Sequence, residues 1–119
     1  MLKEIFTTEG RLNRLPYLKY MAILFVASCI VNVLVPFVAA LLTGDAEGFL
    51  AMTLTFFVSL PLSIGSFMVG IRRLHDLNRT GWFMLLVFIP IVNLLFAIYL
   101  LFFKGTEGYN NYGADPLQF

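Results

Sequence analysis

Charged residues are scarce in this chain, and their scarcity excludes an ordinary soluble domain. Only 13% of the 119 residues are Asp, Glu, Lys or Arg, whereas charged residues make up about 25% of a typical soluble domain. Hydrophobic residues make up 60%, and 13 residues are phenylalanine. A chain of this length forms one domain, and so small a soluble domain has too little interior to hide this much apolar surface. The composition therefore predicts a surface that faces lipid.

Cysteine and histidine occur only once each. Cys29 alone cannot form an intrachain disulfide or a cysteine-rich metal site, so we expect a small side chain that is buried or faces lipid. His75 has no second histidine with which to share a metal ion. It precedes Asp76, but adjacent residues on a helix point in different directions, which argues against a general base. We therefore expect no catalytic activity, no metal, no cofactor and no nucleic-acid partner.

Three long runs contain no charged residue at all, and they cover residues 20–42, 49–71 and 82–103. A helix needs about 20 residues to cross a hydrocarbon core about 30 Å thick. Helices suit lipid because every backbone polar group is bonded within the segment. The fold class predicted is all-α: an integral membrane protein built as a bundle of three transmembrane helices with short loops. Residues 1–119 would form a single membrane domain, with residues 1–19 as an N-terminal segment and residues 104–119 as a polar tail.

The third run contains a second possibility, because Pro90 and Asn93 lie near its middle in the stretch "IPIVN". A break there would produce a re-entrant segment and would return the tail to the side of the N-terminus. Proline is tolerated within membrane helices, so we expect a continuous helix and keep the re-entrant segment as the alternative.

The distribution of lysine and arginine predicts the orientation. Residues 1–19 carry four of these residues, the segment 72–80 carries three, the tail carries only Lys104, and the loop between the first two runs carries none. With three crossings, the N-terminal segment and the segment 72–80 share one side of the membrane. The positive-inside rule makes that side cytoplasmic. We therefore expect a multi-pass protein with a cytoplasmic N-terminus and a tail on the opposite side.

The basic residues form two clusters, "GRLNR" and "RRLHDLNR". Each basic residue near an anionic membrane surface contributes about 1 kcal/mol to binding, whereas an arginine at the bilayer centre costs roughly 2.5 to 3.5 kcal/mol. Both clusters should therefore lie at the membrane surface, where their arginines could bind lipid headgroups or another anion. These arginines are Arg11, Arg14, Arg72, Arg73 and Arg79.

His75 and Asp76 are predicted to order the second cluster, with Asp76 paired to an arginine. Asp76 is the one acid among the five arginines of the two clusters, and residues three or four apart on a helix lie close enough to pair. The candidate partners are Arg72 and Arg79 in the same segment and Arg11 and Arg14 in the N-terminal segment.

Small residues recur at helical spacing on the second run, at Ser59, Ser63, Ser66 and Gly70. Such a face allows two membrane helices to approach closely, so we expect it to contact another copy of the chain or a larger membrane protein. The runs contain no ionisable carboxylate, lysine or arginine, and a proton-coupled carrier or ion pump usually needs one. This absence disfavours transport.

The motifs "GRLNRLPY", "RRLHDLNRTGW", "IPIVN" and "KGTEGYNNYGADP" occur in this order between residues 10 and 116. Together they resemble those of a bacterial inner-membrane family of the YhaH and YhaI type, whose function is unknown. Thr80 stands where the family usually has serine. The resemblance implies a bacterial inner membrane and three helices, and it supplies no reaction. The tail residues that match the family motif are Gly105, Gly108, Asn110, Gly113 and Pro116.

The function that these features favour is binding. We expect a small inner-membrane protein that assembles with itself or with a larger membrane protein, and whose basic cytoplasmic face contacts anionic lipid. One alternative is a small-solute transporter or channel formed by oligomerisation. Another is a membrane enzyme that acts on a lipid phosphate.

Overall fold

The computed structural model describes residues 2–45 and 47–116, and the named elements within these ranges are all helices. The prediction of an all-helical chain is confirmed. In chain order the elements are α1 (Leu2–Ile5), α2 (Arg14–Thr43), α3 (Phe49–Asp76), the 3-10 helix η1 (Gly81–Phe88) and α4 (Val92–Phe102).

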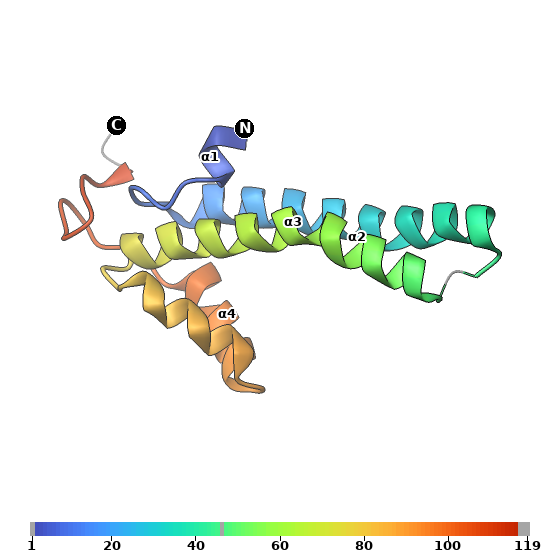
Figure 1. Cartoon of the computed structure of the whole chain (residues 1–119). Coiled ribbons are helices and arrows are strands. Elements are labelled where there is room, and N and C mark those ends of the chain that lie inside the picture. Colours follow the sequence, from blue (N-terminus) through green and yellow to red (C-terminus); the bar gives the residue numbers. More distant parts are fainter. Residues whose placement is uncertain (1, 46, 117–119) are drawn as a thin grey trace.

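The helices α2 and α3 form a long antiparallel pair (Figure 1). Pro16 lies in the first turn of α2, where no backbone N–H needs a partner within the helix. Gly44 ends α2 in the left-handed conformation, with φ 77° and its N–H donated to the carbonyl of Ala40 at 2.7 Å. Glycine is favoured at this position because it has no Cβ to clash. The two helices correspond to the first and second predicted spans.

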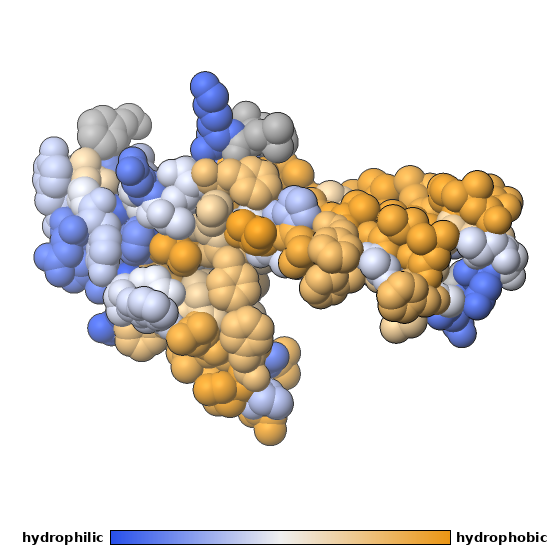
Figure 2. Space-filling model, in the orientation of Figure 1, coloured by the Kyte–Doolittle hydropathy of each residue, from blue (hydrophilic) through white to orange (hydrophobic). Residues whose placement is uncertain are grey.

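Both long helices are suited to lipid rather than to a soluble core. At 1.5 Å per residue, helices of 30 and 28 residues are roughly 40 to 45 Å long, which exceeds a hydrocarbon core of about 30 Å. Only 6% and 17% of their most apolar windows are buried. Figure 2 shows that hydrophobic residues cover the half of this pair that is remote from the chain ends. Two helices therefore have the length, apolarity and exposure of membrane spans.

The third run is not one helix, and the prediction of a continuous span over residues 82–103 is wrong. The chain runs outward through η1, turns at residues 89–91 and returns through α4 (Figure 1). Pro90 donates no N–H to a helix and its ring clashes with the preceding turn. Ile91 then adopts φ 70° and ψ −51°, and a positive φ is rare for a β-branched residue. The N–H of Val92 donates to the carbonyl of Pro90 at 2.8 Å, which closes a γ-turn that reverses the chain. The structure thus has the break that was kept as the alternative.

The segment 81–102 is therefore a helical hairpin, and it is called the hairpin below. Its two arms have 8 and 11 residues, so that each is roughly 16 Å long, at about 2.0 Å per residue in a 3-10 helix and 1.5 Å in an α-helix. Such arms reach only about half of a 30 Å hydrocarbon core. The hairpin is therefore too short to cross a membrane. It begins and ends at the same end of the molecule, so the tail starts at the end where α3 finishes.

The core lies at the end of the molecule where the hairpin, α1 and the chain ends meet (Figure 1). Gly65 and Gly70 allow α3 to pack closely against α1 and against η1, respectively. A methyl group on Gly65 would lie 3.0 Å from Ile5 of α1, and one on Gly70 would lie 2.5 Å from the terminal methyl of Met84 in η1. The buried apolar core residues are Ile5, Leu12, Tyr17, Tyr20, Leu24, Val69, Leu74, Met84, Phe96 and Leu100.

The small-residue face of α3 is used partly within the chain. Gly70 is buried against the hairpin, and Ser66 lines an apolar cavity of about 270 Å³ between α2, α3 and the hairpin. Ser66 also donates its hydroxyl to the carbonyl of Leu62 at 3.0 Å. Gly70 and Ser66 thus face the chain's own hairpin instead of the expected partner. For Ser63, which is exposed, and Ser59, which is half-buried, contact with another chain stays a prediction.

Candidate functional site

Three segments that are far apart in sequence meet at one end of the molecule, which is called the basic end below. These segments are residues 2–19, residues 72–80 and residues 103–116, and together they contain all eight lysines and arginines of the chain. The opposite end carries Asp45 and Glu47 in the α2–α3 loop. Figure 2 shows hydrophilic residues gathered at these two ends and hydrophobic residues between them.

Asp76, in the last turn of α3, is the centre of a buried ion cluster. One carboxylate oxygen, Oδ1, lies 3.0 Å from Nη2 and 3.1 Å from Nε of Arg11. The other, Oδ2, lies 2.8 Å from Nη1 of Arg73. All three side chains are at most 4% exposed. Asp76 therefore pairs with Arg11, which was one of the expected partners. It also pairs with Arg73, which was not among them, although residues three apart on a helix can pair.

The remaining donors of Arg11 bind backbone carbonyls of the tail. Its Nη1 donates to the carbonyl of Gly108 at 2.5 Å and to that of Gly113 at 3.2 Å, and its Nη2 donates to Thr106. A guanidinium presents five N–H donors in a fixed plane, and those of Arg11 join one carboxylate to three tail carbonyls. Arg11 thereby fixes the tail against the end of α3.

Arg73 binds the end of α4 in the same way. Its Nε donates to the carbonyl of Leu100 at 2.6 Å, and its Nη2 donates to that of Phe103. The last carbonyls of a helix have no partner within the helix and carry partial negative charge. Arg73 therefore caps α4 from inside the protein, and it also donates to the carbonyl of Leu12 at 3.3 Å.

The burial of Arg11 and Arg73 corrects their expected role. Both were expected to bind lipid headgroups or an external anion, but they are only 6% and 0% exposed. Each donates hydrogen bonds to Asp76 and to backbone carbonyls. A buried charge is stable only when it is paired and hydrogen-bonded, so the charges of these two guanidinium groups are used inside the fold.

The glycines of the tail motif fit this cluster. A methyl group on Gly105 would lie 2.0 Å from Oδ2 of Asp76, so only glycine fits there. Gly108 and Gly113 have φ values of 72° and 129°, which a side chain would strain. The N–H of Thr106 donates to the backbone carbonyl of Asp76 at 2.7 Å. The tail therefore passes close to α3 at the point where the ion cluster lies.

Asn110 and Asp115 hold the rest of the tail. Asn110 donates its side-chain amide to the carbonyl of His75 at 2.8 Å, and buried Asp115 accepts the N–H of Gly108 at 3.0 Å. Pro116 follows and is half-buried. The sequence offered one signal for Asp115, its place as an acid within the tail motif, and that signal was missed.

His75 connects the N-terminal segment to the tail. Its ring stacks on Tyr112 with centroids 4.0 Å apart and planes 3° apart. Its Nδ1 lies 3.1 Å from the carbonyl of Gly10, which only accepts hydrogen bonds, so Nδ1 is the donor. Among residues 2–45 and 47–116, no group of three or more His, Cys, Asp or Glu could hold a metal ion.

The other basic side chains of the basic end remain at the surface. Arg14 and Arg79 are exposed, and each makes one hydrogen bond, Arg14 to the carbonyl of Phe102 at 3.1 Å and Arg79 to the Tyr99 hydroxyl at 3.5 Å. Lys19 is exposed on α2. Half-buried Arg72 donates to the carbonyl of Glu4. Three of the five predicted arginines therefore stay at least partly accessible.

The carboxylate of Glu4 in α1 also anchors the N-terminal segment. It accepts a hydrogen bond from the hydroxyl of Tyr20 at 3.0 Å. This bond stabilises the charged carboxylate and holds the pKa of Glu4 below its usual value. Glu4 therefore stays ionised within the basic end.

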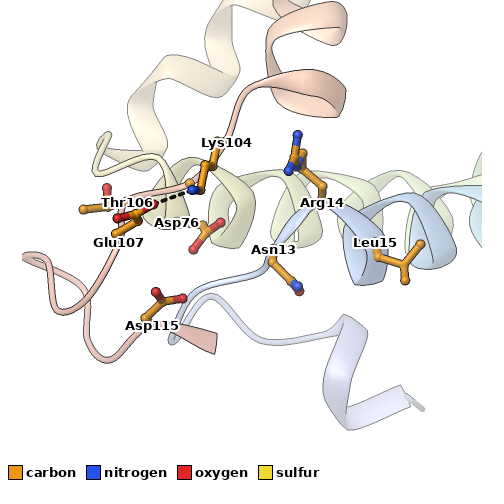
Figure 3. A pocket seen from close by; sticks show the side chains of 9 residues that line it. Asn13, Arg14, Leu15, Asp76, Lys104, Thr106, Glu107 and Asp115 are labelled. Carbon is orange, nitrogen blue, oxygen red and sulfur yellow. Dashed lines mark hydrogen bonds and ion pairs between the residues drawn. The ribbon is translucent and has the colours of Figure 1, made fainter. Parts of the chain in front are cut away.

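A pocket of about 260 Å³, lined mainly by residues with polar or charged side chains, opens beside the ion cluster, and Figure 3 shows its lining. The tail supplies Lys104, Glu107 and Asp115, and the start of α2 supplies Arg14. Lys104 is paired with Glu107. The pocket therefore presents both signs of charge.

The tail and the N-terminal segment contact each other through Arg11, so the expectation that the membrane separates them is not met. The hairpin is the reason, because it reverses the chain before the tail begins.

Comparison with known proteins places these features in one family. The family described as "Protein of unknown function (DUF805)" matches residues 5–114. Inner membrane protein YhaI of Escherichia coli (strain K12) is 32% identical over 116 residues, which cover 98% of this chain and 91% of YhaI. Inner membrane protein YhaH of the same strain is 32% identical over 123 residues, covering 98% of this chain and 92% of YhaH.

No solved structure matches the chain. The family match includes Arg11, Arg73 and Asp76, the three side chains of the ion cluster. The chain belongs to the DUF805 family of bacterial inner-membrane proteins, whose function is unknown.

Proposed function

We propose that this protein is a binding protein of the inner membrane whose basic end faces the cytoplasm and binds anionic phospholipid headgroups. The observation that carries the proposal is the separation of charge. All eight lysines and arginines lie at one end of two membrane-length helices, and the loop at the other end carries only acids. Under the positive-inside rule such an asymmetry places the basic end in the cytoplasm, beside the anionic leaflet.

The residues proposed to bind headgroups are those whose charge is not used inside the fold. Lys3, Arg14, Lys19 and Arg79 are exposed at the basic end, whereas Arg11 and Arg73 are buried. Lys104 is exposed but is paired with Glu107, so we assign it no part in lipid binding.

Assembly with a second copy or with a larger membrane protein would use the exposed part of α3 around Ser63.

The test compares lipid binding by the wild-type protein and by a triple variant, Arg14→Gln, Lys19→Gln and Arg79→Gln. Each cation contributes about 1 kcal/mol at an anionic surface. The triple variant should therefore bind phosphatidylglycerol roughly a hundredfold more weakly. Affinities for phosphatidylglycerol and phosphatidylcholine would be measured by native mass spectrometry of the full-length protein in a mild detergent.

Lys104→Gln is the matched control, because it removes a basic charge from the same end without removing a free cation. It should keep the wild-type preference for phosphatidylglycerol. A wild-type protein that binds both lipids equally well would contradict the proposed function, as would a triple variant that keeps the preference.

A further inference from the structure

A groove of about 430 Å³ lies between the end of α3 and the hairpin. Its floor is apolar, because Leu74 and Phe96 are both buried. Phe83 and Leu86 of η1 form one wall, and Tyr99 of α4 forms part of the other. The volume is within the range of about 300 to 1,000 Å³ that is typical of small-molecule sites.

The mouth of the groove is polar and is held in place by the backbone. Arg79 lines the groove, and its backbone N–H donates to the backbone carbonyl of Leu74 at 2.8 Å. The preceding residue, Asn78, has a φ of 58°, and its side-chain oxygen accepts the N–H of Asn111 at 3.2 Å. The position of Arg79 is therefore fixed by both α3 and the tail.

The polar groups at this mouth can still bind a ligand. Nε of Arg79 donates to the hydroxyl oxygen of Tyr99 at 3.5 Å, which leaves the Tyr99 proton and the two terminal nitrogens of Arg79 to donate to a ligand. No carboxylate within the described ranges 2–45 and 47–116 lies within ion-pair distance of Arg79. Arg79 is thus a positioned cation above an apolar floor.

We propose that this groove binds one anionic phospholipid, with an acyl chain between α3 and the hairpin and the phosphate held by Arg79 and Tyr99. The inference rests on the proposed function and adds a specific site to it. A guanidinium and a hydroxyl together match the oxygens of a phosphate. The groove lies beside the end of α3, which is a membrane-length helix, and its apolar lining suits an acyl chain. Phosphatidylglycerol should bind better than phosphatidylcholine, because its headgroup carries no cation that competes with Arg79 for the phosphate.

The experiment reports on the groove directly by placing the chain's one tryptophan in its wall. A double variant of the full-length chain in detergent would carry Trp82→Phe, which removes the native tryptophan, and Phe83→Trp, which introduces one in the wall of the groove. Phosphatidylglycerol with brominated acyl chains would then be titrated, because bromine quenches tryptophan fluorescence at short range. We expect quenching that saturates at one lipid per chain and that phosphatidylcholine with the same chains reproduces only at about tenfold higher concentration.

Two further substitutions in this background test the headgroup contact. Arg79→Gln should raise the phosphatidylglycerol concentration needed for half-quenching by about tenfold, which corresponds to the loss of one charge-assisted hydrogen bond. Tyr99→Phe keeps the ring and should raise that concentration a few-fold. Lys104→Gln, outside the groove, should leave it unchanged.

The failure of this site and the failure of the proposed function give different results. One outcome is that Arg79→Gln and Tyr99→Phe leave the phosphatidylglycerol concentration for half-quenching unchanged, while the wild-type protein still prefers phosphatidylglycerol. That outcome overturns the groove proposal and leaves the proposed function standing. If quenching follows the bulk lipid concentration without saturation, the groove is not a site. If the wild-type protein shows no preference between the two lipids, the proposed function fails as well.

Discussion

Asp76→Asn is expected to lower the free energy of unfolding by about 3–5 kcal/mol, the cost of removing one partner from a buried ion pair. The substitution leaves the guanidinium groups of Arg11 and Arg73 buried beside each other without the carboxylate that joins them. The new amide also turns an N–H group toward one arginine, which has only donors to offer. The loss would be measured by chemical unfolding of the full-length protein in detergent micelles.

The chain contains a matched control for this substitution. Lys104 and Glu107 form an ion pair with the same three-residue separation as Arg73 and Asp76, but their side chains are 60% and 77% exposed. An exposed pair contributes only about 0–1 kcal/mol, so Glu107→Gln should change stability by no more than that. Equal effects of the two substitutions would show that burial of the Asp76 cluster does not stabilise the fold.

Gly105→Ala is expected to be nearly as damaging, with a loss of roughly 3 kcal/mol, the upper end of the cost of overpacking. Its methyl group would lie 2.0 Å from Oδ2 of Asp76, a carboxylate held by two arginines that cannot move aside. The tail backbone must shift instead, which breaks the hydrogen bond from Thr106 N–H to the Asp76 carbonyl. Unfolding in micelles measures this loss too.

Gly70→Ala separates this mechanism from the general cost of filling space. Its methyl group would meet the end of the Met84 side chain at 2.5 Å, and a methionine side chain adapts easily because it is unbranched and flexible. Alanine also favours the interior of a helix over glycine by about 1 kcal/mol. We therefore expect little change or a small gain in stability. A larger loss at Gly70 than at Gly105 would contradict the assignment of the rigid contact to Asp76.

The long helices could be predicted from the sequence because length and apolarity alone define them. Phe49 begins both the predicted second span and α3. The hairpin could not be predicted with the same assurance, because its cause is conformational. Pro90 is compatible with a continuous membrane helix, and nothing in the residue type of Ile91 indicates a φ of 70°.

The location of the candidate site was accessible from the sequence, but the roles of its residues were not. The motifs around Arg11, Asp76 and Gly105 mark the segments that meet. Arginines that flank membrane spans are ordinarily at the surface, and that expectation was wrong for Arg11 and Arg73. Their burial depends on the tail folding back across α3, which in turn depends on the hairpin. A correct assignment of roles therefore required the three-dimensional path of the third apolar run.

The return of the tail to the side of the N-terminus is the central feature of this account, and cysteine labelling in spheroplasts tests it most directly. Single cysteines would be introduced as Glu47→Cys in the α2–α3 loop and as Tyr109→Cys in the tail, where the native side chain is 78% exposed. Both variants would carry Cys29→Ser, which removes the chain's one native thiol.

An impermeant maleimide should label the cysteine at position 47 in intact spheroplasts and should label the one at position 109 only after the membrane is permeabilised. This pattern requires an odd number of crossings between the two positions, namely the single crossing of α3, and a cytoplasmic tail. Labelling of both positions in intact spheroplasts would contradict the account, because the third run would then have to cross the membrane.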